Sequence, residues 1–272
     1  MTRRILLLTA FLLLLAAALA WWHEERRLEP VALTPALTGE TEYCLTCHAG
    51  IEEISVSHPV EAFGCVLCHG GERLALEADL AHSSLRGGAN PSDLAVADAS
   101  CGGDDCHGGA AELERDHLQR VMTSIQVSYT GAITLLRYSF GEQPDLTPLY
   151  GMLEITDTSL PSATGFLHLD SFEAAAEKHP SLQAFGENCL TCHIGGEPAP
   201  GRQYQRFTGC ATCHTPIPAG APDLVAHADG TATGGVHTLT TAIPYSQCNT
   251  CHNRGNYNLR TMTFVERTDH PT

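Results

Sequence analysis

All twelve cysteines of this chain fall into six short motifs, and no other feature constrains its fold as strongly. In five motifs, two cysteines are separated by two residues and followed at once by a histidine. These five are Cys44, Cys47 and His48; Cys65, Cys68 and His69; Cys189, Cys192 and His193; Cys210, Cys213 and His214; and Cys248, Cys251 and His252. In the sixth, four residues separate Cys101 from Cys106, and His107 follows. Disulfides or zinc sites would use the cysteines but would leave these histidines unexplained.

The pattern Cys-x-x-Cys-His is the attachment signature of c-type haem. Two thiols one short turn apart can add to the two vinyl groups of one haem, and the next histidine becomes the proximal ligand of its iron. In the stretched motif, Gly102 and Gly103 would let the longer loop bulge away from the ring. The motifs therefore predict six c-type haems with His48, His69, His107, His193, His214 and His252 as proximal ligands.

The composition favours a fold built around these cofactors. Only 6% of the 272 residues are aromatic, so a core made of polypeptide alone would be thin. Six buried porphyrins would supply the missing apolar mass, and haem binding and folding should then be inseparable. The formal net charge of -16, which the haem propionates would make more negative, argues against nucleic acid as a partner.

The N-terminus predicts export from the cytoplasm. Arg3 and Arg4 precede an apolar run over residues 5–22, which is the arrangement of a secretory signal. Ala18-Leu19-Ala20 fits a cleavage site, whereas a run of 18 residues is also just long enough to span a bilayer as a retained anchor. Both interpretations, a cleaved signal peptide and a signal anchor, place the rest of the chain outside the cytoplasm, in the periplasm or extracellular space.

The motifs form two groups of three that superimpose when 145 is added to the residue number. This offset carries the motif of Cys44 onto that of Cys189, and the motif of Cys65 onto that of Cys210. It also carries His82, which lies outside the motifs, onto His227. A register kept across the motifs and one further histidine indicates a duplicated trihaem unit.

The same numbering predicts the domain organisation. We expect a signal peptide or signal anchor over residues 1–22 and a linker over 23–40. A first trihaem unit would follow over 41–120, a helical and loop connection over 121–180, and a second trihaem unit over 181–272. Apolar spacing favours one long helix over residues 112–140 and a short helix over 170–179. The expected fold is mostly coil with scattered short α-helices around a haem core, and little β-structure.

Histidines outside the motifs are the candidates for the distal positions of the six irons. In the first half, the candidates are His58, His82 and His117; in the second half they are His179, His227 and His237. His227 is supported by the repeat, and the other two precede their nearest motifs by similar distances. His168, His270 and Met262 stand in reserve, while His23 lies too close to the apolar run to be a good candidate.

Over residues 41–253 the motif set resembles the multihaem cytochromes c of periplasmic and extracellular respiratory chains. The resemblance implies electron transfer through a chain of largely bis-histidine haems, with redox proteins or a membrane quinol oxidoreductase complex as partners. It implies no catalytic residue in the chain. An N-terminal anchor would also be similar to that of membrane-anchored quinol-oxidising cytochromes. Whether copies assemble into oligomers or filaments is left open.

Two other functions stay open at this point. A multihaem reductase or oxidase would need one haem iron with an open distal position, for which Met262 or an unfilled sixth position in the second half is the only hint. An electron-transfer subunit of a larger membrane complex would use residues 112–140 as a docking surface. A carbon monoxide difference spectrum separates the first of these from a carrier, and co-purification of partner subunits separates the second.

Overall fold

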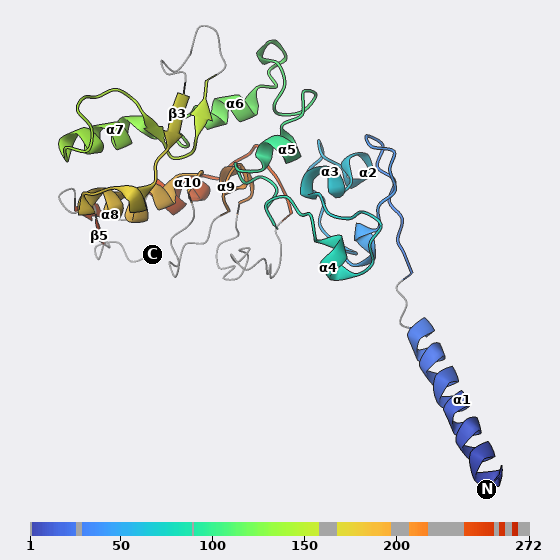
Figure 1. Ribbon diagram of the computed structural model, residues 1–272. Helices are drawn as coiled ribbons and strands as arrows, with labels where there is room; N and C mark the ends of the chain where they lie inside the picture. The colour runs from blue at the N-terminus through green and yellow to red at the C-terminus, as the bar shows by residue number, and fades with distance from the viewer. Residues whose placement is uncertain are drawn as a thin grey trace.

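The computed structural model describes residues 2–25, 29–88, 90–157, 168–196, 207–216, 237–252, 256–258 and 263–265 (Figure 1). This part of the chain is mostly coil with short helices and little sheet. The α-helices are α1 (Thr2–Glu25), α2 (Val60–Phe63), α3 (Val66–His69), α4 (Ala78–Ala81), α5 (Ala97–Cys101), α6 (His117–Met122), α7 (Thr130–Ser139), α8 (Pro180–Asn188), α9 (Ala211–His214) and α10 (Tyr245–His252). The 3-10 turns are η1 (Cys44–Thr46), η2 (Ala111–Leu113), η3 (Ala174–Ala176) and η4 (Leu190–Cys192).

The helix α1 contains the apolar run predicted to direct export. The apolar side chains described along it are exposed, from Leu7 at 64% to Trp22 at 51%. Within the described ranges, no helix has both the length and the apolar composition required to cross a bilayer. The choice between signal peptide and anchor stays a prediction.

Part of the segment expected to be a linker packs on the first group of motifs. Leu33 forms a β-bridge with Glu42, and the backbone N–H groups of Ala36 and Leu37 donate to carbonyls of Glu61 and Ala62 at 2.9 and 3.0 Å. Residues 33–37 are therefore held against α2.

The protein's own apolar core is formed mainly by the part of the chain that connects the two groups of motifs. A three-stranded sheet has the order β1 (Tyr150–Gly151), β3 (His168–Ser171), β2 (Ile155–Thr156), with β1 parallel and β2 antiparallel to β3. One core cluster joins this sheet to α7 and α8 through Ile133, Met152, Phe172, Phe185 and Leu190; the other contains Leu94, Val127, Ile155 and Leu169. A separate pair, β4 (Asn256–Asn258) and β5 (Thr263–Val265), is antiparallel.

The prediction of one helix over residues 112–140 is wrong. The region contains η2, α6 and α7, separated by residues with positive φ, Glu114 at 54° and Tyr129 at 42°. Between α6 and α7 the hydroxyls of Thr123, Ser124 and Ser128 donate to backbone carbonyls three or four residues earlier. Such local hydrogen bonds compete with helix continuation.

The short helix expected over residues 170–179 is also displaced. Residues 168–171 form β3, and the helix α8 begins only at Pro180. Proline suits the first turn of a helix but disfavours helical geometry in the residue before it. His179 accordingly has extended backbone angles and caps α8 instead of ending a helix.

Candidate haem-binding sites

The motifs that begin at Cys44, Cys65, Cys101 and Cys210 close with the same backbone hydrogen bond, in which the histidine N–H donates to the carbonyl of the first cysteine. The N···O distances are 3.0 Å for His48 to Cys44, 2.9 Å for His69 to Cys65, 2.9 Å for His107 to Cys101 and 3.0 Å for His214 to Cys210. The third of these is the stretched motif. Its extra residues form a tight turn closed by the N–H of Cys106 and the carbonyl of Gly103 at 2.7 Å. The longer loop thus bulges while its ends keep the geometry of the shorter motifs.

The second motifs of the two halves share a short helix and the glycine turn that precedes it. The helix α3 and the helix α9 have bounds that differ by the offset of 145. Each is preceded by a glycine with positive φ, Gly64 at 66° and Gly209 at 63°. The side chain of any other residue would collide there, with Pro35 and Glu42 at Gly64 and with the backbone of Ser92 at Gly209.

Different residues anchor these two motifs. The buried carboxylate of Glu42 accepts hydrogen bonds from the N–H groups of Cys65 and Val66 at 2.6 and 3.0 Å. In the other half Ser92 has this role. Its carbonyl accepts a hydrogen bond from the N–H of Cys210 at 3.1 Å, and its hydroxyl accepts one from the N–H of Ala211 at 2.9 Å. A residue of the first half therefore positions a motif of the second.

Three motif histidines lie opposite histidines from outside the motifs. Ring centres are 6.1 Å apart for His48 and His82, 6.0 Å for His107 and His58, and 6.1 Å for His69 and His237. A histidine nitrogen lies about 2 Å from a metal that it binds and the ring centre roughly 1 Å further out, so two histidines on opposite sides of one ion have centres roughly 6 Å apart. The three separations fit bis-histidine iron sites.

Two of these pairs join histidines within the first half of the chain. In the third, His237, which is a candidate ligand for the second half, lies against His69 of the first. The ligand assignments stay predictions. His117 also lies near His107, at 5.3 Å, so His107 has two histidine neighbours. The distance of 6.0 Å between the rings of His107 and His58 is closer to the separation of two histidine ligands on one iron than the 5.3 Å between His107 and His117.

Hydrogen bonds orient several of the rings for metal binding. The Nδ1 atom of His214 lies 2.8 Å from the backbone carbonyl of Thr240, and that of His237 lies 2.8 Å from the carbonyl of Glu52. The Nδ1 atom of His193 lies 3.3 Å from the carbonyl of Gln126. A carbonyl only accepts, so Nδ1 carries the proton in each ring. In His214 and His237 the lone pair of Nε2 then faces away from this hydrogen bond. This second hydrogen bond is the usual partner of a metal-binding histidine.

The surroundings also favour the neutral form of the imidazole, which is the form that binds metal. Burial lowers the pKa of His69 to about 4, with smaller contributions from His237 and His48. Burial also lowers the pKa of His107, and the neighbouring His117 and His58 lower it further by smaller amounts.

The other candidates have different surroundings. His179 stacks on Phe140 at 4.3 Å, and its Nδ1 accepts from the N–H of Ser181 at 3.2 Å, which places the proton of the neutral ring on Nε2. His168 uses both ring nitrogens, with Thr156 at 3.0 Å and Asp170 at 3.2 Å. His227, His270 and Met262, together with the side chains of His23 and His252, lie outside the described residues.

Motifs from both halves lie close to one another. Burial raises the pKa of Cys68 to about 11 and that of Cys210 to about 11, and in each case the Cys101 thiol is the next contributor. Cys101 ends α5, which packs against α3, and Figure 1 shows α5 between α3 and α9. Haems on these three motifs would be neighbours.

Within the described ranges, Glu42, Cys44 and Cys65 offer ligand atoms within 4.8 Å of one another. Numbered in chain order, motifs 1 to 6 begin at Cys44, Cys65, Cys101, Cys189, Cys210 and Cys248. The two oxygens of Glu42 already accept the N–H groups of Cys65 and Val66 in motif 2, and both thiols belong to attachment motifs. The group fits a haem-motif anchor better than a separate metal centre.

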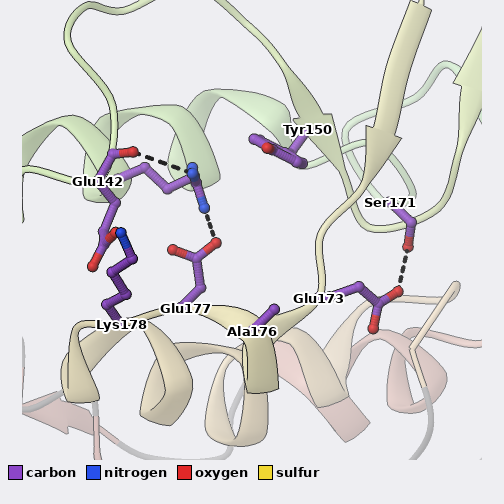
Figure 2. Close-up of a pocket in the computed structure, with 8 residues that line it drawn as sticks. Glu142, Tyr150, Ser171, Glu173, Ala176, Glu177 and Lys178 are labelled. Atoms are coloured by element: carbon purple, nitrogen blue, oxygen red, sulfur yellow. Dashed lines mark hydrogen bonds and ion pairs between the residues drawn. The ribbon is translucent and has the colours of Figure 1, made fainter.

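A cavity of about 400 Å³ between α7 and the segment that leads into α8 has a different character (Figure 2). Arg137 forms an ion pair with the buried Glu177 and lies over the ring of Tyr150, 4.4 Å from its centre. Neither cysteine nor histidine lines this cavity. The residues clamp α7 to the segment that leads into α8 and offer no haem ligand.

Sequence reasoning named the motif and distal histidines but missed the residues that position them, which are Glu42, Ser92, Glu52 and Thr240. The repeat offset flags Gly64 and Gly209, whereas nothing in the sequence pattern flags the other four. Comparison of the chain with protein-family models, curated proteins and solved structures finds no match.

Proposed function

We propose that this chain is a multihaem c-type cytochrome that transfers electrons outside the cytoplasm. The observation that carries the proposal is the pairing of three motif histidines with non-motif histidines at ring separations of 6.0–6.1 Å. Each such pair is the ligand set of a six-coordinate iron, and each motif histidine follows two cysteines that can bind the same haem. Bis-histidine ligation leaves no position for a substrate and so favours a carrier.

The residues would divide the work as follows. The twelve cysteines would hold six haems covalently, and the motif histidines would provide the proximal ligands. Each haem would supply an iron that takes up and releases one electron. His82, His58 and His237 would close the distal positions at motifs 1, 3 and 2.

The protein also orders these sites. Glu42 and Ser92 anchor the second motif of each half, and the segment 90–93 bonds across to residues 208–211. This cross-bonding supports a short route between the two groups of haems. Export by residues 1–22 would place the carrier where c-type haem is attached and where redox proteins or a membrane quinol oxidoreductase complex could exchange electrons with it.

A carbon monoxide difference spectrum of the reduced holoprotein, combined with a potentiometric titration, tests the carrier function. We expect no carbon monoxide binding by the haems of motifs 1, 2 and 3, and several one-electron steps in the titration. Stoichiometric binding at these motifs would overturn the carrier assignment and favour a reductase or oxidase with an open iron.

A further inference from the structure

Residues 237–240 cross from the second half of the chain to the first. We call this segment, His237-Thr238-Leu239-Thr240, the strap. The N–H of Leu239 donates to the carbonyl of Ile54 at 2.8 Å. The N–H of His237 donates to the carboxylate of Glu52, to which the N–H of Thr238 also donates at 3.3 Å. The strap is thus bonded along residues 52–54, which lie between motifs 1 and 2.

One end of the strap reaches motif 2. The His237 ring lies 6.1 Å from that of His69, with an angle of 25° between the ring planes. Its Nδ1 donates to the carbonyl of Glu52 at 2.8 Å, so the lone pair of Nε2 is free to bind. Both of these hydrogen bonds of His237 go to Glu52, a residue of the first half, so the position of His237 depends on contact between the halves.

The other end of the strap holds the proximal histidine of motif 5. The N–H of Thr240 donates to the carbonyl of His214 at 2.8 Å, and Nδ1 of His214 donates to the carbonyl of Thr240 at 2.8 Å. This pair of bonds fixes both the orientation and the tautomer of the His214 ring. A hydrogen bond from the far ring nitrogen also raises the basicity of a metal-binding histidine.

We infer that the strap is a coordination element shared by the two trihaem units. It supplies the distal ligand of the motif-2 haem through His237 and orients the proximal ligand of the motif-5 haem through Thr240. The inference rests on the proposed function and extends it. The two halves form one redox unit, and a disturbance of the strap alters one haem of each half together.

Replacing His237 tests the ligand role. The variant H237A should keep six covalent haems, counted by mass spectrometry, while one more iron than in the wild type binds carbon monoxide after reduction. The variant H237M should bind no additional carbon monoxide, because thioether sulfur fills the position, and one haem should titrate at a raised potential. The control V56A removes an exposed side chain close to residues 52–54, which bind the strap, and it should leave both measurements unchanged.

A proline in the strap tests the coupling. The variant L239P loses the N–H that bonds Ile54, whereas L239A keeps it. We expect the low-spin ferric electron paramagnetic resonance signals of two haems to change in L239P and none in L239A. A change at one haem or at none, with six haems attached, would overturn the shared role of the strap.

The haem count separates failure of the inference from failure of the proposed function. Six haems in H237A without additional carbon monoxide binding would overturn the strap alone. A wild-type chain without covalent haem would overturn the proposed function, and the strap's role with it.

Discussion

The imidazole rings of His48 and His82 lie with their centres 6.1 Å apart, although His48 belongs to an attachment motif and His82 is the C-cap of the short helix α4. The backbone of His82 is held by its N–H, which donates to the carbonyl of Ala78 at 3.0 Å. A separation of roughly 6 Å between ring centres is that of two histidines on one metal ion. The pair is therefore the simplest test of the ligand assignments, because both residues belong to the first half of the chain.

Replacement of His82 should open or alter one iron site. In H82A, one reduced haem should bind carbon monoxide. In H82M, the potential of one haem should rise by on the order of 0.1 V, within the roughly 0.8 V that axial ligands span. The neighbouring exposed residue provides a control, S83A, for which both measurements should match the wild type. An H82A protein that binds no carbon monoxide would contradict the assignment.

The anchor of motif 2 should contribute to stability. Removal of the Glu42 carboxylate in E42A leaves two backbone N–H groups of the motif without their acceptor. Buried donors left without a partner cost about 1–3 kcal/mol each. Thermal unfolding of the holoprotein should therefore show a loss of several kcal/mol. The exposed Glu40, which pairs with Arg73, provides the control E40A with a loss of about 0.5 kcal/mol. Equal losses would show that Glu42 is not an anchor.

Two glycines with nearly equal φ allow the cost of backbone strain to be measured apart from the cost of a steric collision. Gly64 has a φ of 66° and Gly39 a φ of 65°, but a Cβ would meet Pro35 and Glu42 at the first position and nothing within 4 Å at the second. G39A should cost about 1–2 kcal/mol for the left-handed conformation alone. G64A should cost distinctly more and lower the yield of holoprotein. Similar unfolding temperatures for the two variants would contradict the close approach at motif 2.

The ion pair of Arg137 with Glu177, which joins α7 to the segment that leads into α8, should affect stability without affecting the haems. In R137A, the buried Glu177 loses its cationic partner, which costs about 3–5 kcal/mol. The exposed side chain of Arg120 pairs with Asp116 and provides the control R120A, which should leave the stability nearly unchanged because water screens an exposed ion pair. Reduced and oxidised absorption spectra of folded R137A should match those of the wild type. Altered haem spectra would place this cavity in the redox machinery.

Local chemistry made the motif turns predictable, because two cysteines and a histidine at fixed spacing leave the backbone few ways to close. The offset of 145 also aligns Gly64 with Gly209, and both glycines have a positive φ in the structure. The partner of His237 could not be predicted, since it depends on a strap that pairs with residues 52–54, far away in the chain. The break at Tyr129 was missed for another reason. Apolar spacing continues through it, while the competing hydrogen bonds of Thr123, Ser124 and Ser128 have no periodic signature.

The mass of the holoprotein under denaturing conditions tests the central claim most directly. Covalent haem survives denaturation, whereas zinc dissociates and disulfides leave only the mass of the chain. The account predicts the mass of the processed or unprocessed polypeptide plus six haems, with every cysteine blocked to alkylation after reduction. A polypeptide mass without haem, or twelve cysteines open to alkylation, would contradict it.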